Sequence, residues 1–301
     1  MRVRDLFVRR EDGAAAAAVA AADPGARFLD RITEELGDGP INLPYFPDVV
    51  LRVRRALDDP GSSADDIVRI AGAEPRLAAR LIQTANSVVF NPSGRSSPHL
   101  RAAVTRLGHH LVQSVAMVFA IQQMKADSTL RGVSRPLGDL WEKSIAVGSI
   151  CQVLARQLNV PTDKVFMTGL LHGIGHFYIL VRAAESESPV AYADLPSRLV
   201  AERHPAIGKS VLEKWGFETV VCDAVGSQRD YQRESSRAAD ITDVLIASIL
   251  LAEVFLEDGG DLGRTEGVTA FDRLDMGAEH LQAVLKHTEH SIGSLRQTLS
   301  L

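Results

Sequence analysis

The residues best suited to chemistry lie in one short stretch, 168–177, which reads T-G-L-L-H-G-I-G-H-F. His172 stands there among apolar residues and glycines, and its imidazole is a side chain that can bind a divalent metal ion. Gly173, the next residue, has no donor atom. His172 therefore has no adjacent side chain with which to share a metal ion.

A second histidine, His176, follows four residues after His172. The two imidazoles would share one helix face only if the helix continued through Gly173 and Gly175, and glycines argue against such continuity. No phosphate-binding loop, serine-hydrolase elbow or zincin motif occurs in the sequence. These three enzyme classes therefore receive no support.

The elements that must position these residues are predicted to be helices. The chain has 301 residues, 46% of them hydrophobic, which is enough for the core of one large or two small domains. Aromatic residues make up only 5%, while alanine and leucine are abundant. Apolar residues recur at helical spacing and no stretch has a strand pattern. We therefore predict an all-α fold.

The cysteines and the most apolar stretch bear on cellular location. Cys151 and Cys222 lie far apart and outside any C-x-x-C pattern, so we expect free buried thiols in a cytoplasmic protein. The stretch 241–256 is apolar nearly all round, yet it contains Asp243 and Glu253. It is typical of a central core helix rather than of a membrane span.

Charge is distributed unevenly along the chain. The net charge is −5, which argues against general nucleic-acid binding. Residues 51–106 contain nine arginines and five acidic residues, whereas residues 253–301 contain nine acidic and four basic residues. Solvated helix faces explain both runs, and opposite charges can also steer protein partners toward each other.

Proline, glycine and polar clusters divide the chain into five parts. We expect an N-terminal arm, flexible or helical, then a helical subdomain, a connection, a second helical subdomain, and an acidic C-terminal loop and helix. In this order the parts cover residues 1–40, 41–125, 126–139, 140–256 and 257–301.

The first subdomain contains a helix that carries Leu100 to Leu107, then Gly108, then a longer helix. Such an order of helix, glycine and helix also occurs in helix-turn-helix DNA-binding proteins. The second helix here is apolar along two faces instead of basic and polar. A role in reading DNA is therefore disfavoured.

Two sets of motifs occur in order along the chain. The second half contains W-E-K-S, G-L-L-H-G-I-G, E-R-H-P-A-I-G-K-S-V-L-E-K-W-G and A-S-I-L-L-A-E, and the first half contains L-P-Y-F-P-D-V-V-L-R-V, A-E-P-R-L-A-A-R-L-I-Q-T-A-N-S-V-V-F and R-A-A-V-T-R-L-G. Over residues 41–256 this ordered set resembles the HD-related output domain, or HDOD, family. The resemblance implies two packed helical subdomains, the second like a degenerate HD bundle, in bacterial signalling proteins related to HD and HD-GYP metal phosphohydrolases.

The resemblance also implies where a metal site would stand. Ser144 takes the place of the first ligand histidine, His172 matches the histidine of the HD pair, and Gly173 replaces its aspartate. Two expected donors are therefore absent at the centre of the site.

The later positions are only partly filled. His204 matches a further histidine, Ser227 and Gln228 stand near a former histidine pair, and Glu253 falls close to the last acidic ligand. Two imidazoles and one carboxylate are too sparse a set for a hydrolytic metal, which needs more ligands and an open position for water. We interpret His172 and His204 as core histidines and expect no metal or other cofactor.

These observations favour a non-catalytic signalling module that acts through protein contacts. Its expected partners are signalling proteins or a second copy of the chain, without membrane or nucleic acid. Two alternatives remain open. One is a residual metal-dependent phosphohydrolase acting on nucleotides or cyclic dinucleotides, and the other, less favoured, is a DNA-binding regulator.

Overall fold

The structure is a computed structural model. It describes residues 23–38, 47–87, 90–91, 93–158, 160, 162–185, 188, 190–235, 238–256, 261–277, 280–288 and 292. All regular elements in these residues are helical, which confirms the predicted all-α fold. Most of the predicted N-terminal arm and the last residues of the chain lie outside the described part.

The first group of helices comprises α3 (Asp48–Asp58), α4 (Ala64–Gly72), α5 (Pro75–Asn86) and α6 (Leu100–Lys125). Their ends follow local chemistry. Ser63 and Asp66 form a reciprocal capping box at the start of α4, and Pro75 is the first residue of α5, where its missing N–H costs nothing. Gly108 has a φ of 68° and interrupts α6, as the sequence predicts.

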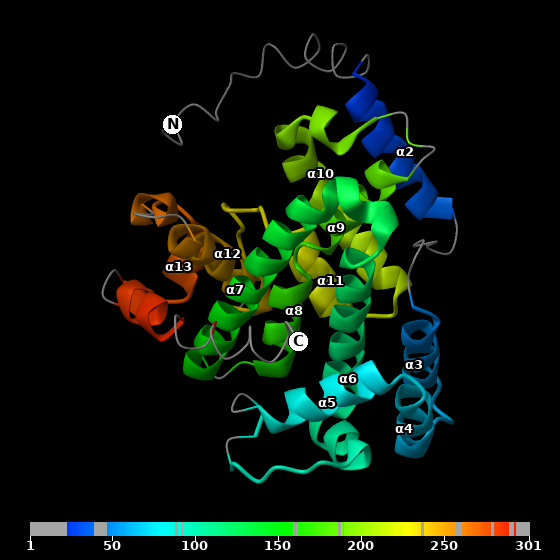
Figure 1. Cartoon of the computed structure of the whole chain (residues 1–301). Helices are drawn as coiled ribbons and strands as arrows, with labels where there is room; N and C mark the ends of the chain where they lie inside the picture. The colour runs from blue at the N-terminus through cyan, green and yellow to red at the C-terminus, as the bar shows by residue number, and fades with distance from the viewer. Residues whose placement is uncertain are drawn as a thin grey trace, which may run out of the picture.

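Helix α6 joins the two groups of helices. Beyond Gly108 it is buried nearly all round, from Leu111 to Met124, and it packs against α3, α5, α7 and α8. In Figure 1 it runs upward from beside α5 into the middle of the molecule. A helix enclosed in this way has no free face for the groove of DNA.

The second group surrounds the stretch that carries His172. Its helices are α7 (Ser134–Leu158), α8 (Thr162–Leu171), α9 (Ile174–Ala184), α10 (Ser197–Lys214), α11 (Thr219–Gly226) and α12 (Ile241–Leu256), with a 3-10 turn, η4 (Tyr192–Asp194), before α10. Helix α7 packs on α8 and α12, and α9 packs on α10. Helix α12 is buried from Ile241 to Ala252, as expected for a central core helix.

Part of the predicted N-terminal arm belongs to this second group. Residues 24–38 form α2 (Pro24–Asp38), whose Phe28, Leu29 and Ile32 side chains are buried in the core. Helix α2 packs beside α10 at the top of Figure 1, far from α3. Spacing alone did not show this, because an amphipathic helix does not reveal which neighbour its apolar face covers.

Two predicted boundaries move in the structure. The connection predicted at 126–139 is shorter, because a 3-10 segment, η3 (Ser128–Val133), leads directly into α7 at Ser134. Pro136 lies in the first turn of α7, where proline is tolerated. Proline suits the first turn of a helix, so Pro205 predicts a helix start; instead α10 begins at Ser197, and Pro205 lies inside it.

The C-terminal elements cover one side of α12. They are η5 (Leu262–Thr265), α13 (Thr269–Arg273) and a helix at 280–288, drawn in orange and red in Figure 1. Phe271 and Val284 are buried in the common core. The acidic tail thus contributes to the fold as well as to surface charge.

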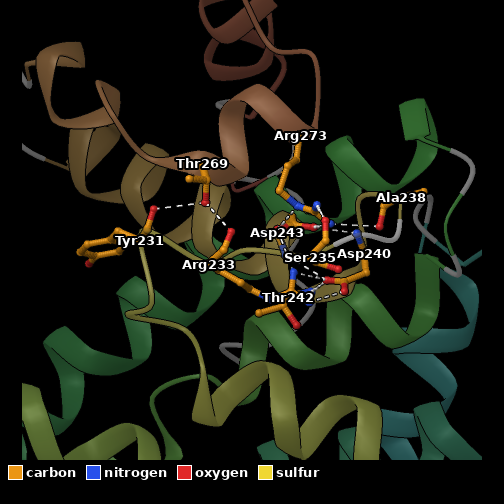
Figure 2. A network of polar contacts seen from close by, with 9 residues as sticks. All are labelled: Tyr231, Arg233, Ser235, Ala238, Asp240, Thr242, Asp243, Thr269 and Arg273. Atoms are coloured by element: carbon orange, nitrogen blue, oxygen red, sulfur yellow. Dashed lines mark hydrogen bonds and ion pairs between the residues drawn. The ribbon is translucent and has the colours of Figure 1, made fainter.

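An arginine–aspartate cluster fastens this side of the molecule (Figure 2). Asp243 has no exposed side chain and accepts hydrogen bonds from both Arg233 (2.9 Å) and Arg273 (3.0 and 3.1 Å). Asp240 also pairs with Arg233, and its side chain caps α12 by accepting from the Thr242 amide at 2.9 Å. We call Arg233, Asp240, Asp243 and Arg273 the buried ion cluster.

One apolar stretch meets the length and composition of a membrane span. It is Lys164–Ala184, which comprises α8 and α9, and most of it is buried inside the molecule. Burial of this kind is expected of helices in a protein core.

The two cysteines are buried free thiols, as the sequence predicts. Burial raises the pKa of Cys151 to about 12 and that of Cys222 to about 11. Neither thiol therefore ionises near neutral pH, so neither is a poised nucleophile or a metal ligand.

Candidate functional site

A cavity of about 420 Å³ lies in front of His172. Helices α7, α9, α10 and α12 and the turn after α11 supply its walls. Its lining residues are Pro136, Asp139, Leu140, Lys143, His172, Gly173, His176, Tyr192, His204, Gln228, Arg229, Tyr231, Ile249 and Glu253. The structure therefore brings together four of the five positions predicted from the sequence, and Ser144 is the exception.

His172 lies in the turn between α8 and α9 and is buried. Its Nδ1 is 2.7 Å from the carbonyl oxygen of Gly169, so Nδ1 carries the proton and donates it. Burial, with the nearby Lys143 ammonium, lowers the pKa of His172 to about 3. The ring is therefore neutral at physiological pH, with its Nε2 unprotonated.

An aspartate at Gly173, as in the HD pattern, would require the tip of the Leu140 side chain to shift. A Cβ atom at this position would lie 2.8 Å from Cδ1 of Leu140 and 3.5 Å from Oγ of Ser144. Ser144 itself is buried and faces a small apolar recess between α7 and α9 instead of the cavity.

His176 lines the same cavity as His172, although we expected the glycines to separate them. Helix α9 starts again at Ile174 and includes Gly175, so His176 is carried back over the cavity. A Cβ atom on Gly175 would lie 2.0 Å from the carbonyl oxygen of His204 and 2.5 Å from the amide of Gly208. The glycine permits a close crossing of α9 and α10 and does not end the helix.

This crossing places His204 beside His176, with ring centroids 5.9 Å apart. His176 Nε2 is 2.8 Å from the hydroxyl of Tyr192. His204 Nδ1 is buried without a hydrogen-bond partner among the described residues. Burial is the main cause that lowers the pKa of His176 to about 4 and that of His204 to about 2, so both rings are neutral.

Helix α7 contributes a cation that the sequence reasoning did not single out. Lys143 Nζ lies 2.7 Å from Oε1 of Glu253 on α12, and both side chains are partly exposed. Glu253, which we expected near the last acidic ligand position, is therefore the counter-ion of a lysine. In the sequence, the only sign that Lys143 belongs to the site was its position next to Ser144 in the W-E-K-S motif.

The turn after α11 adds two further groups. The amide of Gln228 donates to the carbonyl oxygens of His172 (3.0 Å) and Val225 (2.7 Å), so its donors are occupied. Arg229 lines the cavity and is exposed, with no hydrogen bond or ion pair from its side chain to any described residue. Ser227, by contrast, is not among the lining residues.

Comparison with known proteins assigns this architecture. A sequence model of the HDOD domain matches residues 43–231, which is more than half of the chain. The chain belongs to the HDOD family. The matched region includes His172 and His204 and ends before α12, so the family resemblance predicted from the motifs is confirmed.

Relatives of this HDOD protein carry names of two kinds. A candidate metal-dependent phosphohydrolase from Shewanella amazonensis SB2B is 26% identical, with a TM-score of 0.68 over 90% of this chain and 99% of that one. A candidate signal transduction protein from Marinobacter aquaeolei VT8 is 20% identical, with a TM-score of 0.54 over 93% and 67% of the two chains, and shares the fold.

A longer relative comes from Treponema pallidum (strain Nichols). It is an uncharacterised protein that is 21% identical over 207 residues, or 65% of this chain. The match spans only 39% of the length of that relative. The HDOD region is therefore one part of a larger protein in that case.

The cavity of this HDOD protein does not suit a divalent metal. Within the described residues no group of three or more histidine, cysteine, aspartate or glutamate side chains is placed to hold one. Of the two carboxylates that line the cavity, Glu253 is already bound to the Lys143 ammonium, and Asp139 is exposed to solvent. A fixed cation beside the imidazoles repels a second one, so the residues present do not fit the metal that HD enzymes use.

Proposed function

We propose that this HDOD protein is a non-catalytic module of bacterial signal transduction that acts in the cytoplasm through contacts with other proteins. The single observation that carries the proposal is the Lys143–Glu253 pair, 2.7 Å apart inside the cavity where a hydrolytic metal would be needed. The name of the Marinobacter aquaeolei relative, which has the same fold, is in line with a signalling role.

The remaining side chains of the cavity offer little hydrolytic chemistry. The three imidazoles are neutral, and His172 and His176 each have one ring nitrogen engaged, with Gly169 and Tyr192. A phosphoryl-transfer site without a metal lacks the main means of stabilising the charge that develops in the transition state. These features support the proposed non-catalytic role over hydrolysis.

Elemental analysis and a turnover assay test this proposal. We expect the purified full chain to contain substoichiometric iron, manganese and zinc, and to hydrolyse neither bis(p-nitrophenyl) phosphate nor cyclic dinucleotides when these metals are added. The Gly173→Asp variant should stay inactive, because Ser144 supplies no imidazole and Glu253 is paired with Lys143. Stoichiometric metal that is lost in His172→Ala, together with turnover, would refute the proposal.

The basic first subdomain supplies a test for protein contacts. Arg52 and Arg55 are exposed on α3 with no partner among the described residues, whereas Arg54 pairs with Asp58 at 3.3 Å. Unpaired exposed charges contribute to encounter rates more than to stability. They are therefore suited to steering an acidic partner or the acidic tail of a second copy.

We expect the Arg52→Glu/Arg55→Glu variant to weaken salt-sensitive self-association, or association with a signalling partner, while Tm hardly changes. Sedimentation velocity of the purified chain at low and high salt measures the first effect. Arg198→Glu, a charge reversal on exposed α10, is the matched control. Unchanged association combined with specific DNA binding in a mobility-shift assay would favour a DNA-binding regulator instead.

A further inference from the structure

A second chamber of about 360 Å³ adjoins the histidine cavity. The two share five lining residues, so they are direct neighbours between α7, α9, η4 and α10. The second chamber is lined by Lys143, His176, Tyr192, Ala193, Leu195, Ser197, Val200, Ala201, His204 and Arg229. A space of this size is within the range of sites for small organic ligands.

The charge of the second chamber is one-sided. Lys143 and Arg229 both line it, and none of its described lining residues is acidic. The acidic side chains of Glu253 and Asp139 line only the first chamber. Because Glu253 neutralises Lys143 from that side, Arg229 leaves an excess of positive charge where the two chambers meet.

Uncharged donors lie at the same place. The Tyr192 hydroxyl is 2.8 Å from His176 Nε2, and Ser197 adds a second hydroxyl to the lining. His204 Nδ1 is buried with no partner among the described residues, which is costly in a native structure unless something else binds there. A polar ligand group at this place would meet the Tyr192 and Ser197 hydroxyls, each of which can donate or accept a hydrogen bond.

The outer wall of the second chamber is apolar. Ala193, Leu195, Val200 and Ala201 supply it, from η4 and the first turns of α10. Leu195 and Val200 are buried behind it, whereas Ala193 is exposed and Ala201 is partly exposed, so the alanines supply the apolar surface that a ligand could cover. An inorganic ion would leave this wall uncovered, whereas a compact hydrocarbon or aromatic group would bury it.

We propose that the adjoining chambers bind a small organic anion. Its phosphate or carboxylate group lies against Arg229 and Lys143, and its apolar body lies against Ala193 and Ala201. Guanidinium and ammonium groups bind both phosphate and carboxylate, and a partly enclosed site strengthens such charge-assisted hydrogen bonds. The site stands apart from the contacts proposed for α3, and only the prediction that the anion stays intact rests on the proposed function.

Calorimetric titration of the full chain tests the site. The probes are phenyl phosphate, benzoate and inorganic phosphate, with benzyl alcohol as the uncharged control. We expect phenyl phosphate or benzoate to bind more tightly than inorganic phosphate, and benzyl alcohol not to bind; the stronger of the two identifies the anionic group. Absence of binding by all three anions at millimolar concentration would overturn the proposal.

Two variants place the ligand. Arg229→Gln should weaken binding about tenfold or more, since it removes a charge-assisted contact. Arg198→Gln, which removes the same charge from an exposed position on α10 that does not line either chamber, should leave binding unchanged. Equal affinities of these two variants would contradict the proposal.

Ala201→Phe tests the apolar wall, because the new ring would occupy the second chamber. We expect it to reduce phenyl phosphate binding about tenfold while inorganic phosphate, which needs only the cationic end, is little affected. Circular dichroism confirms that each variant is folded. Undiminished phenyl phosphate binding in folded Ala201→Phe would show that the ligand does not use this chamber.

Phosphorus NMR of the phenyl phosphate titration separates this proposal from the proposed function. Binding without release of inorganic phosphate is the expected result. Binding with release would keep the site and refute the non-catalytic role. Absence of binding would remove the site and leave the non-catalytic role standing.

Discussion

Two polar regions within the second group of helices differ in how their charges are compensated. In the buried ion cluster, two arginines face two aspartates, and Asp243 is hydrogen-bonded to both arginines (Figure 2). In the histidine cavity, Lys143 has one counter-ion, Arg229 has none among the described residues, and His204 Nδ1 has no partner there. The first region is electrostatically complete, whereas the second is not.

The difference indicates separate roles. A buried polar network that satisfies all its members holds elements in one arrangement, here α12 against α13 and the loop before α12. A region with surplus positive charge and an unpaired imidazole is stable only because it borders an open space. The cluster is therefore expected to govern stability, and the cavity to govern binding.

The largest expected effect is on the buried cluster. Asp243→Asn removes the charge that both Arg233 and Arg273 face, and leaving buried charges uncompensated costs about 3–5 kcal/mol of unfolding free energy. Denaturant unfolding measures this loss. The control is Asp223→Asn, which breaks an exposed pair with Lys209 and should cost no more than about 1 kcal/mol. Similar losses in both variants would mean that the cluster has no special role in stability.

A smaller effect is expected where α9 crosses α10. Gly175→Ala places a methyl group against the backbone of His204 and Gly208, so the helices must separate, at a cost of about 1–3 kcal/mol. The same substitution at Gly138 on α7, where no atom lies within 4 Å, should be neutral or stabilising. Equal stability of the two variants would contradict this prediction and mean that the helices can separate at no cost.

Acid should destabilise the cavity side through its neutral histidines. The pKa of His172 is lowered from 6.5 to about 3, so the unfolded chain binds this proton first, and stability present above pH 6.5 is lost as the pH falls toward 3. The groups facing the ring are Lys143, His176, His204 and Glu253. None of them supplies a free negative charge that would restore a normal pKa.

Each histidine whose pKa is lowered in this way should reduce the unfolding free energy by about 1 kcal/mol per pH unit below pH 6.5. The unfolding free energy can be measured with denaturant at neutral and at mildly acidic pH. The difference between the two pH values should be smaller for His172→Gln than for the parent chain. The exposed His99→Gln variant is the control and should leave the pH dependence unchanged. An identical pH dependence in His172→Gln and the parent would show that His172 titrates normally.

The smallest expected effect is that of Arg229→Gln in the histidine cavity, which is compared with Arg233→Gln in the buried ion cluster. Arg229→Gln should change the unfolding free energy by no more than about 0.5 kcal/mol, because an exposed arginine without a partner stabilises little. Arg233→Gln should cost several times more, since Arg233 is bound to Asp240 and Asp243. Equal costs would remove the distinction between a structural cluster and a binding region.

Much of the fold could be predicted from local patterns. Helical spacing indicated the central core helix, Ser63 and Asp66 indicated the start of α4, and the positive φ of Gly108 appeared where the sequence placed a break. These features depend on neighbours in sequence, which the sequence shows directly. The limits of α7 and α10 were less predictable, because prolines near helix starts and inside helices are both tolerated when packing compensates.

By itself the sequence determined the family resemblance and the absence of a donor atom at Gly173, because both depend on which residues are present. Only the tertiary structure decided which groups meet around His172. Lys143 and Glu253 are 110 positions apart, and Gly175 meets Gly208 only where α9 crosses α10. Such juxtapositions follow from how helices cross and not from spacing along the chain. The same reason hid His176 and Arg229 from the predicted site.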